Sequence, residues 1–73
     1  MTVIAVTRSY NDKLDLFNCK NKEEAKELVS SMYNTFKKNK KIDLNNTFIS
    51  DDNMYAQVAN GLEITEIRVG ELV

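Results

Sequence analysis

Apolar side chains recur at helical spacing in the middle of the chain and predict a helix over residues 22–38. They follow the positions i, i+3, i+4, i+7 and i+11, which share one face of a helix. The apolar residues are Ala25, Leu28, Val29, Met32 and Phe36. Asn21 is a suitable N-cap, Glu24 completes a capping box, and Asn39 is suited to end the helix in a left-handed conformation. We therefore expect this apolar face to be buried.

Two strands are predicted before the helix. Thr2–Arg8 is rich in β-branched residues and its apolar character is nearly continuous, as in a strand covered on both sides. Residues 9–12 (Ser-Tyr-Asn-Asp) have the chemistry of a turn. Residues 13–17 then alternate, with Leu14 and Leu16 on one side and Phe17 on the other. Together these segments predict a hairpin that leads into the helix.

Three further strands are predicted after the helix, over residues 47–50, 54–59 and 62–69. Turn residues 51–53 (Asp-Asp-Asn) separate the first two of these strands. Asn60 and Gly61 separate the last two and form the strongest signal for a two-residue hairpin in the chain. We expect Gly70 to end the last strand.

The last predicted strand contains a break in its alternation. Leu62 and Ile64 share one side, whereas Ile67 and Val69 share the other. A β-bulge near residues 65–66 (Thr-Glu) would bring the two halves back into phase. Alternatively, both sides of this strand are partly covered.

The order β-β-α-β-β-β predicts an α+β fold in which one helix packs on one face of an antiparallel sheet, within a single domain over residues 1–73. One helix covers only one face, so the opposite face lacks a second layer. We expect Phe17, Tyr55 and half of the Thr2–Arg8 strand to lie on that face. A small protein with apolar residues on an uncovered sheet face tends to dimerise or to dock on another molecule.

The residues that carry most enzyme chemistry are scarce. The chain has one cysteine, no histidine and two glycines, so a disulfide, the commonest zinc ligand and a glycine-rich phosphate loop are all missing. Cys19 is open to two interpretations, a redox role near the start of the helix or a small buried apolar residue. Residues 51–53 lack the glycine and the distal glutamate of a calcium loop. We therefore expect no catalytic residue, no cofactor and no bound metal.

A lone thiol, the lack of a signal-like apolar segment at the N-terminus and the lack of a long apolar stretch favour a cytoplasmic protein. Frequent Asn, Lys and Ile residues are typical of an A/T-rich genome, and a short chain of this type is typical of accessory proteins of phages and other mobile elements.

Charge divides the chain near residue 41. Nine Lys and Arg face five Asp and Glu up to that point, whereas six acids face one base after it. The basic cluster consists of Lys37, Lys38, Lys40 and Lys41. It would grip phosphates, with Phe36 or Tyr33 stacking on a base, or it is simply a solvated helix end that the helix dipole favours.

The acidic half supplies the candidate contacts for a protein partner. They are Tyr55, Asp51, Asp52, Glu63 and Glu66. Tyrosine is favoured at binding hot spots, and spaced carboxylates fit a basic surface on another protein. The same carboxylates also serve as ordinary surface charge that keeps edge strands soluble.

The sequence therefore predicts a non-enzymatic protein-interaction module, an accessory or inhibitory protein of a phage or mobile element. We expect it to form a homodimer and to bind another protein, one with a basic surface, through the uncovered sheet face or an edge strand. The alternative is a nucleic-acid-binding accessory protein that uses the lysine cluster.

Overall fold

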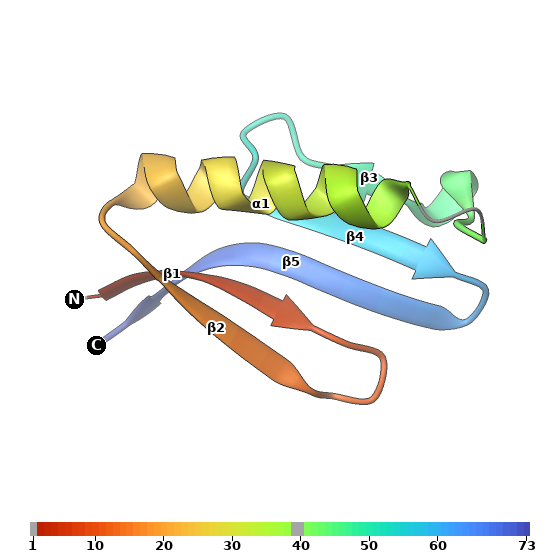
Figure 1. Ribbon diagram of the computed structural model, residues 1–73, viewed down its shortest axis with the longest axis horizontal. Coiled ribbons are helices and arrows are strands. Elements are labelled where there is room, and N and C mark those ends of the chain that lie inside the picture. Colours follow the sequence, from red (N-terminus) through yellow and green to blue (C-terminus); the bar gives the residue numbers. More distant parts are fainter. Residues whose placement is uncertain (1, 39–40) are drawn as a thin grey trace.

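The computed structural model describes residues 2–38 and 41–73, which form a five-stranded antiparallel sheet with one helix on one of its faces (Figure 1). The elements are β1 (Thr2–Arg8), β2 (Leu14–Cys19), α1 (Lys22–Lys37), a short 3-10 helix η1 (Leu44–Asn46), β3 (Phe48–Ile49), β4 (Tyr55–Asn60) and β5 (Glu63–Leu72). The predicted α+β fold and element order are confirmed. The proposed helix end at Asn39 lies outside the described residues.

The sheet has the order β2-β1-β5-β4-β3, so the central strand β5 lies next to β1, which comes from the opposite end of the chain. β1 pairs with β5 from Thr2 opposite Leu72 to Arg8 opposite Glu66. The two ends of the chain therefore lie side by side (Figure 1). This pairing joins the hairpin β1–β2 to the hairpin β4–β5, and leaves β2 and β3 as the edge strands.

The helix begins as the sequence predicts, with the Asn21 side chain accepting a hydrogen bond from the Glu24 backbone N–H at 2.8 Å. It packs over β5, β1 and β4. Its buried residues are Ala25, Val29 and Tyr33. Leu28 and Met32 are partly buried against the core.

The prediction that Phe36 lies in the core was wrong. Phe36 is 39% exposed, whereas Tyr33 is only 7% exposed. The buried stripe therefore runs at i, i+4, i+8 along the helix and not towards i+11. A tyrosine can replace a phenylalanine here because its ring is as apolar as that of phenylalanine and only its hydroxyl needs a polar surrounding.

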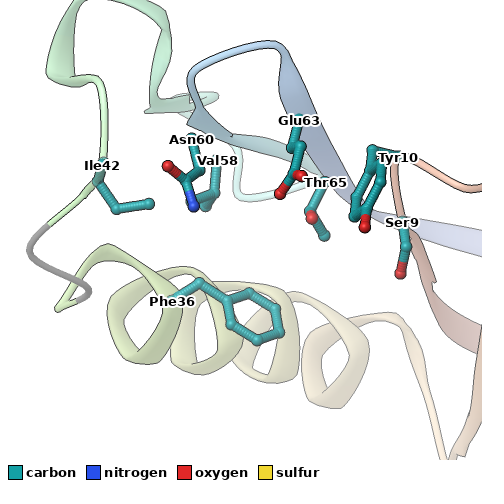
Figure 2. A pocket seen from close by; sticks show the side chains of 8 residues that line it. All are labelled: Ser9, Tyr10, Phe36, Ile42, Val58, Asn60, Glu63 and Thr65. Carbon is teal, nitrogen blue, oxygen red and sulfur yellow. The ribbon is translucent and has the colours of Figure 1, made fainter.

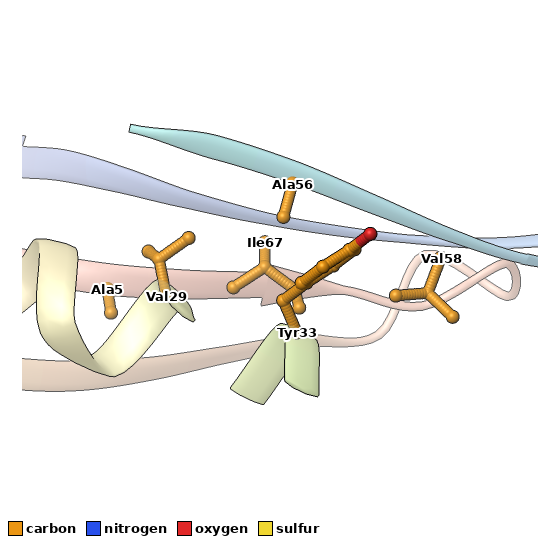
Figure 3. Packing of buried hydrophobic residues seen from close by; sticks show 6 residues of the cluster. All are labelled: Ala5, Val29, Tyr33, Ala56, Val58 and Ile67. Atoms are coloured by element: carbon orange, nitrogen blue, oxygen red, sulfur yellow. The ribbon is translucent and has the colours of Figure 1, made fainter. Parts of the chain in front are cut away.

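The core lies between the helix and the sheet. Figure 3 shows Val29 and Tyr33 pointing from α1 towards the sheet, where Ala5, Ala56, Val58 and Ile67 lie. Val29 and Ile67 are its largest fully buried side chains. The shortest dimension of the molecule is 15 Å, which accommodates one helix layer on one sheet layer, since such layers pack about 10 Å apart.

The β4–β5 hairpin has no bulge near Thr65 and Glu66, so the break in alternation remains. Ile64 lies on the side of the sheet away from the helix, whereas Ile67 lies on the helix side. Asn60 pairs with Glu63, so the turn is centred on Gly61 and Leu62 and not on Asn60 and Gly61. Gly61 has a φ of +63° at the first loop position, as in a type II′ turn. This one-residue shift changes which residues face each other along the whole hairpin.

In the observed register, Val58 pairs with Thr65 and Ala56 pairs with Ile67 on the helix side of the sheet. The pairing is continuous from Tyr55 to Asn60 and contains no bulge. The prediction that Gly70 ends the last strand was also wrong, because β5 continues to Leu72 and pairs with β1 over that length.

Residues directly opposite each other on neighbouring strands share a side of the sheet, which assigns the residues of β2. Ala5 faces the helix, and Phe17 is its partner. Phe17 therefore lies on the helix side, contrary to the prediction. Leu14 and Leu16 lie on the opposite side, which we call the open face. Tyr55 is on the open face as predicted, because the next residue, Ala56, belongs to the core.

Candidate interaction site

The open face carries an apolar depression at the β2–β1–β5 end of the sheet. It is lined by Ile4, Val6, Leu14, Leu16, Gly70 and Leu72, together with Arg68, Val69 and Glu71. The depression has a volume of about 540 Å³. Its floor is buried by its neighbours, with Ile4 only 3% exposed, whereas Leu16 on its rim is 52% exposed. Among the described helices, α1 packs on the other side of the sheet and η1 contacts β4, so neither covers the β2–β1–β5 end.

The depression exists because Gly70 lies among larger side chains. Gly70 pairs with Ile4 across β1 and β5. A Cβ atom at this position would lie 3.6 Å from Ile4 Cγ1 and 3.6 Å from Val6 Cγ2. Those are ordinary van der Waals contacts, so the floor has room for a side chain that the sequence does not supply.

An aromatic corner occupies the other end of the open face. The rings of Phe48 and Tyr55 lie with their centroids 5.9 Å apart. The Tyr55 hydroxyl donates to Gln57 Oε1 at 3.3 Å, and Gln57 Nε2 donates to the Asn46 carbonyl at 2.9 Å. These contacts fix the tyrosine in one orientation, so Tyr55 is a half-buried ring and not a freely exposed one.

The pKa of Tyr55 is raised, first by partial burial and then by the negative charge of Glu66. Glu66 lies on the same open face, since it pairs with Gln57 on one side and with Arg8 on the other. Arg68 lies between Val6 and Tyr55. A charged strip thus separates the apolar depression from the aromatic corner.

One predicted partner contact, Glu66, acts on Tyr55 directly, and two others lie in the turn before β4. Glu66 shares its face, and Asp51 and Asp52 lie in the turn that leads into β4. Ser50 Oγ donates to Asp52 Oδ1 at 2.7 Å and the Met54 N–H donates to the same oxygen at 3.0 Å. These two hydrogen bonds lower the pKa of Asp52. Asp52 therefore also has a structural role, because it holds the turn.

Glu63 does not join this group. It follows the β4–β5 turn, at the opposite end of β4, and its pairing with Asn60 places it on the helix side. There it lines a cavity of about 190 Å³ beneath the last turns of α1 (Figure 2). Phe36, Tyr10 and Ile42 contribute the apolar part of that cavity.

Three of the four lysines of the predicted basic cluster lie within the described residues. Lys37 Nζ lies 5.5 Å from the centroid of the Tyr33 ring, a cation–π contact within the helix. Tyr33 itself is buried, so it is not available to stack on a base. Lys38 and Lys41 are exposed, and Lys40 lies outside the described residues.

Cys19 is the last residue of β2 and packs, half-buried, against the core. Its Sγ donates to the Phe17 carbonyl at 3.5 Å. This placement favours the interpretation of Cys19 as a small apolar residue.

Within residues 2–38 and 41–73, no group of three or more His, Cys, Asp or Glu residues is placed to hold a metal ion. No helix in the described part of the chain has the length and apolar character needed to span a membrane.

The sequence did not identify Leu14, Leu16, Gly70 and Leu72 as site residues. The sequence showed that Leu14 and Leu16 share one side of β2, but which side of the sheet they occupy depended on the pairing with β1.

The open face offers apolar surface, one hydrogen-bonded tyrosine and charges of both signs, which suits binding. Comparison of the chain with protein-family models, with curated proteins and with solved structures finds no match.

Proposed function

We propose that this protein is a non-enzymatic binding domain that docks on another protein through its open face. The observation that carries the proposal is the apolar depression on the sheet face opposite α1, with the hydrogen-bonded Tyr55 at the other end of that face. Contiguous apolar surface of this kind is typical of protein interaction sites.

The layout of the face supports a protein partner. Protein interfaces have an apolar centre that takes an anchor side chain, surrounded by polar residues, and tyrosine is enriched among the residues that contribute most to affinity. Here the hollow above Gly70 receives the anchor, and Arg68 and Glu66 form the polar surround. The rigid sheet holds these groups in place, so little entropy is lost on binding.

Charge supports a partner with basic groups near one corner. Glu66 acts on Tyr55 from the same face, and Asp51 and Asp52 lie in the turn before β4, so a partner that docks at this corner would gain from a basic side chain. Such charges mainly accelerate association and orient the partner. In this proposal the protein acts in the cytoplasm, as an accessory or inhibitory factor.

Filling the depression tests the proposal. Gly70→Val adds two methyl groups beyond the Cβ in the hollow, and valine suits a strand. Ser31→Val is the matched control, because it adds apolar bulk to an exposed position of the helix layer. Tagged wild type and both variants are used for affinity capture from the native host, after circular dichroism has confirmed that each is folded.

The proposal expects a protein that wild type and Ser31→Val both capture and that Gly70→Val does not. Calorimetry with that purified protein should then give at least a tenfold weaker affinity for Gly70→Val. A set of captured proteins that Gly70→Val leaves unchanged would contradict docking through the open face.

A further inference from the structure

We propose that a second copy of this chain pairs with the exposed edge of β2, antiparallel and with Leu16 opposite Leu16 of the second copy. This interaction uses a strand edge and is independent of the open-face docking proposed above. It would join two sheets into one continuous sheet.

β2 is a long edge strand without the usual protection. Five of its six residues are exposed, whereas the edge strand on the other side, β3, has only two residues. Proteins normally blunt such edges with proline, lysine, bulges or covering elements. β2 contains no proline or lysine and pairs regularly with β1 along its length. The helix α1 packs mainly over β5, β1 and β4 and makes a smaller contact with β2 (Figure 1).

The backbone groups that face outward can be identified. The Ser9 N–H donates to the Lys13 carbonyl at 2.9 Å, and these two residues continue the β1–β2 register. In antiparallel strands, hydrogen-bonded and non-hydrogen-bonded pairs alternate. Asp15, Phe17 and Cys19 therefore bond to β1, and the N–H and C=O groups of Leu14, Leu16 and Asn18 point away from the sheet.

The pairing of β1 with β5 leads to the same assignment of the outward-facing groups of β2. The Val69 N–H donates to the Met54 carbonyl at 2.9 Å, so the odd-numbered residues of β5 bond to β4 and its even-numbered residues bond to β1. Ile4 and Val6 therefore bond to β5, and Ala5 and Thr7 bond to β2. Two independent hydrogen bonds thus assign the same three residues of β2 to the free edge.

Symmetry restricts how two such edges can pair. A two-fold axis perpendicular to the sheet keeps both open faces on one side, so residues opposite each other must be of the same side. With Leu16 opposite itself, Leu14 of each copy faces Asn18 of the other, and the outward groups of all three residues are used.

The two neighbouring registers of the β2–β2 pairing are less favourable. Moving the pairing by one step in one direction places Asp15 opposite Asp15 of the second copy, and like charges directly opposite destabilise a sheet. Moving it in the other direction leaves Leu14 beyond the end of the second strand, since β2 stops at Cys19.

The pairing has a consequence for the open face. Leu14 and Leu16 form the outer rim of the apolar depression. Two copies joined along β2 would place these rims side by side on the same face, which gives one apolar surface of about twice the length. A dimer would therefore present two anchor sites in a fixed arrangement.

A proline at Asn18 tests the pairing. Asn18→Pro removes an outward N–H and leaves the bonds to β1 intact, because proline is tolerated where a strand N–H faces solvent. Asn18→Thr keeps the N–H and is the matched control. Sedimentation equilibrium should show a concentration-dependent dimer for wild type and for Asn18→Thr, and a dissociation constant raised about tenfold or more for Asn18→Pro, since symmetry removes two hydrogen bonds.

Amide hydrogen exchange of the wild type gives a second readout that needs no variant. The amide protons of Leu14, Leu16 and Asn18 should become protected as protein concentration rises, whereas those of Asp15 and Phe17 are protected at every concentration. A chain that stays monomeric into the millimolar range would overturn the proposal. A dimer in which Asn18→Pro binds as wild type does, or in which the three outward amides stay unprotected, would also overturn it.

Discussion

Gly70 lies directly opposite Ile4 in the pairing of β5 with β1, so β5 supplies no side chain opposite Ile4 on the open face. The 3.6 Å distance from a hypothetical Cβ to Ile4 Cγ1 is an ordinary contact. The glycine is therefore not required by its backbone conformation or by crowding. In the account proposed here, it is present because a partner side chain takes that space.

Gly70→Ala is expected to stabilise the protein. Alanine reduces the conformational freedom of the unfolded chain, which is worth about 0.4–1 kcal/mol where the native conformation accepts it. Urea denaturation of wild type and variant measures the difference in the free energy of unfolding. A loss of stability of about 1 kcal/mol or more would show that the space above Ile4 is smaller than the structure indicates.

Tyr33 and Phe36 should differ clearly in their contribution to stability. Tyr33→Ala is expected to cost about 3–5 kcal/mol, because it leaves a cavity in the core. Phe36→Ala is expected to cost about 1–2 kcal/mol, because the ring is already 39% exposed. Thermal or urea unfolding of the two variants tests the orientation of the helix, and a larger loss for Phe36→Ala would contradict it.

The contrast between these two residues shows what the sequence could predict. Helical spacing, the Asn21 cap and the turn residues predicted the elements and their order correctly. The same spacing could not decide whether the buried stripe passes through Tyr33 or Phe36, because both lie beside it and both are aromatic. That choice depends on how the helix crosses the sheet, which is a tertiary property.

The open face was predictable in outline and not in detail. One amphipathic helix implies an uncovered sheet face, and Tyr55 was correctly placed there. The sides of Phe17, Leu14 and Leu16 depended on the register with β1, which local alternation does not specify. The β4–β5 hairpin shows the same limit. Its turn lies one residue later than predicted, so each β4 residue has a different partner, although the same sides of the two strands face the helix.

The turn before β4 should respond to pH through Asp52. Its pKa is lowered below the ordinary value of 3.8, first by the Ser50 hydroxyl and then by the Met54 N–H. A carboxylate whose pKa is lower in the folded state adds stability above its unfolded pKa, and this stability is lost as the pH falls through the folded pKa. We expect the stability difference between wild type and Asp52→Asn to be largest near neutral pH and to shrink below pH 3.8.

NMR titration gives the site-specific check. The Asp52 carboxyl should titrate below the ordinary aspartate value in wild type, and its pKa should move upward in Ser50→Ala, which removes the hydroxyl donor. Ser9→Ala is a control in a different turn. An Asp52 pKa that Ser50→Ala leaves unchanged would show that the hydroxyl does not hold the carboxylate in solution.

The nucleic-acid alternative makes a separate prediction about salt. Binding through Lys37 and Lys38 would weaken steeply with salt, with a slope of about 0.9 for each phosphate neutralised on duplex DNA. We expect fluorescence anisotropy to detect no such binding to generic DNA or RNA at low salt, because Tyr33 is buried and the net charge of the chain is −1. A steep salt slope that Lys37→Gln with Lys38→Gln abolishes would favour the alternative.

The most direct test of the central claim is site-specific photo-crosslinking in the native host. A photoreactive amino acid replaces Leu72, which lines the depression but lies away from the β2 edge. In a matched experiment it replaces Ser31 on the helix. Docking through the open face predicts a discrete crosslink from position 72 to a different protein and none from position 31. The same crosslinked proteins from both positions, or a partner reached only from position 31, would contradict it.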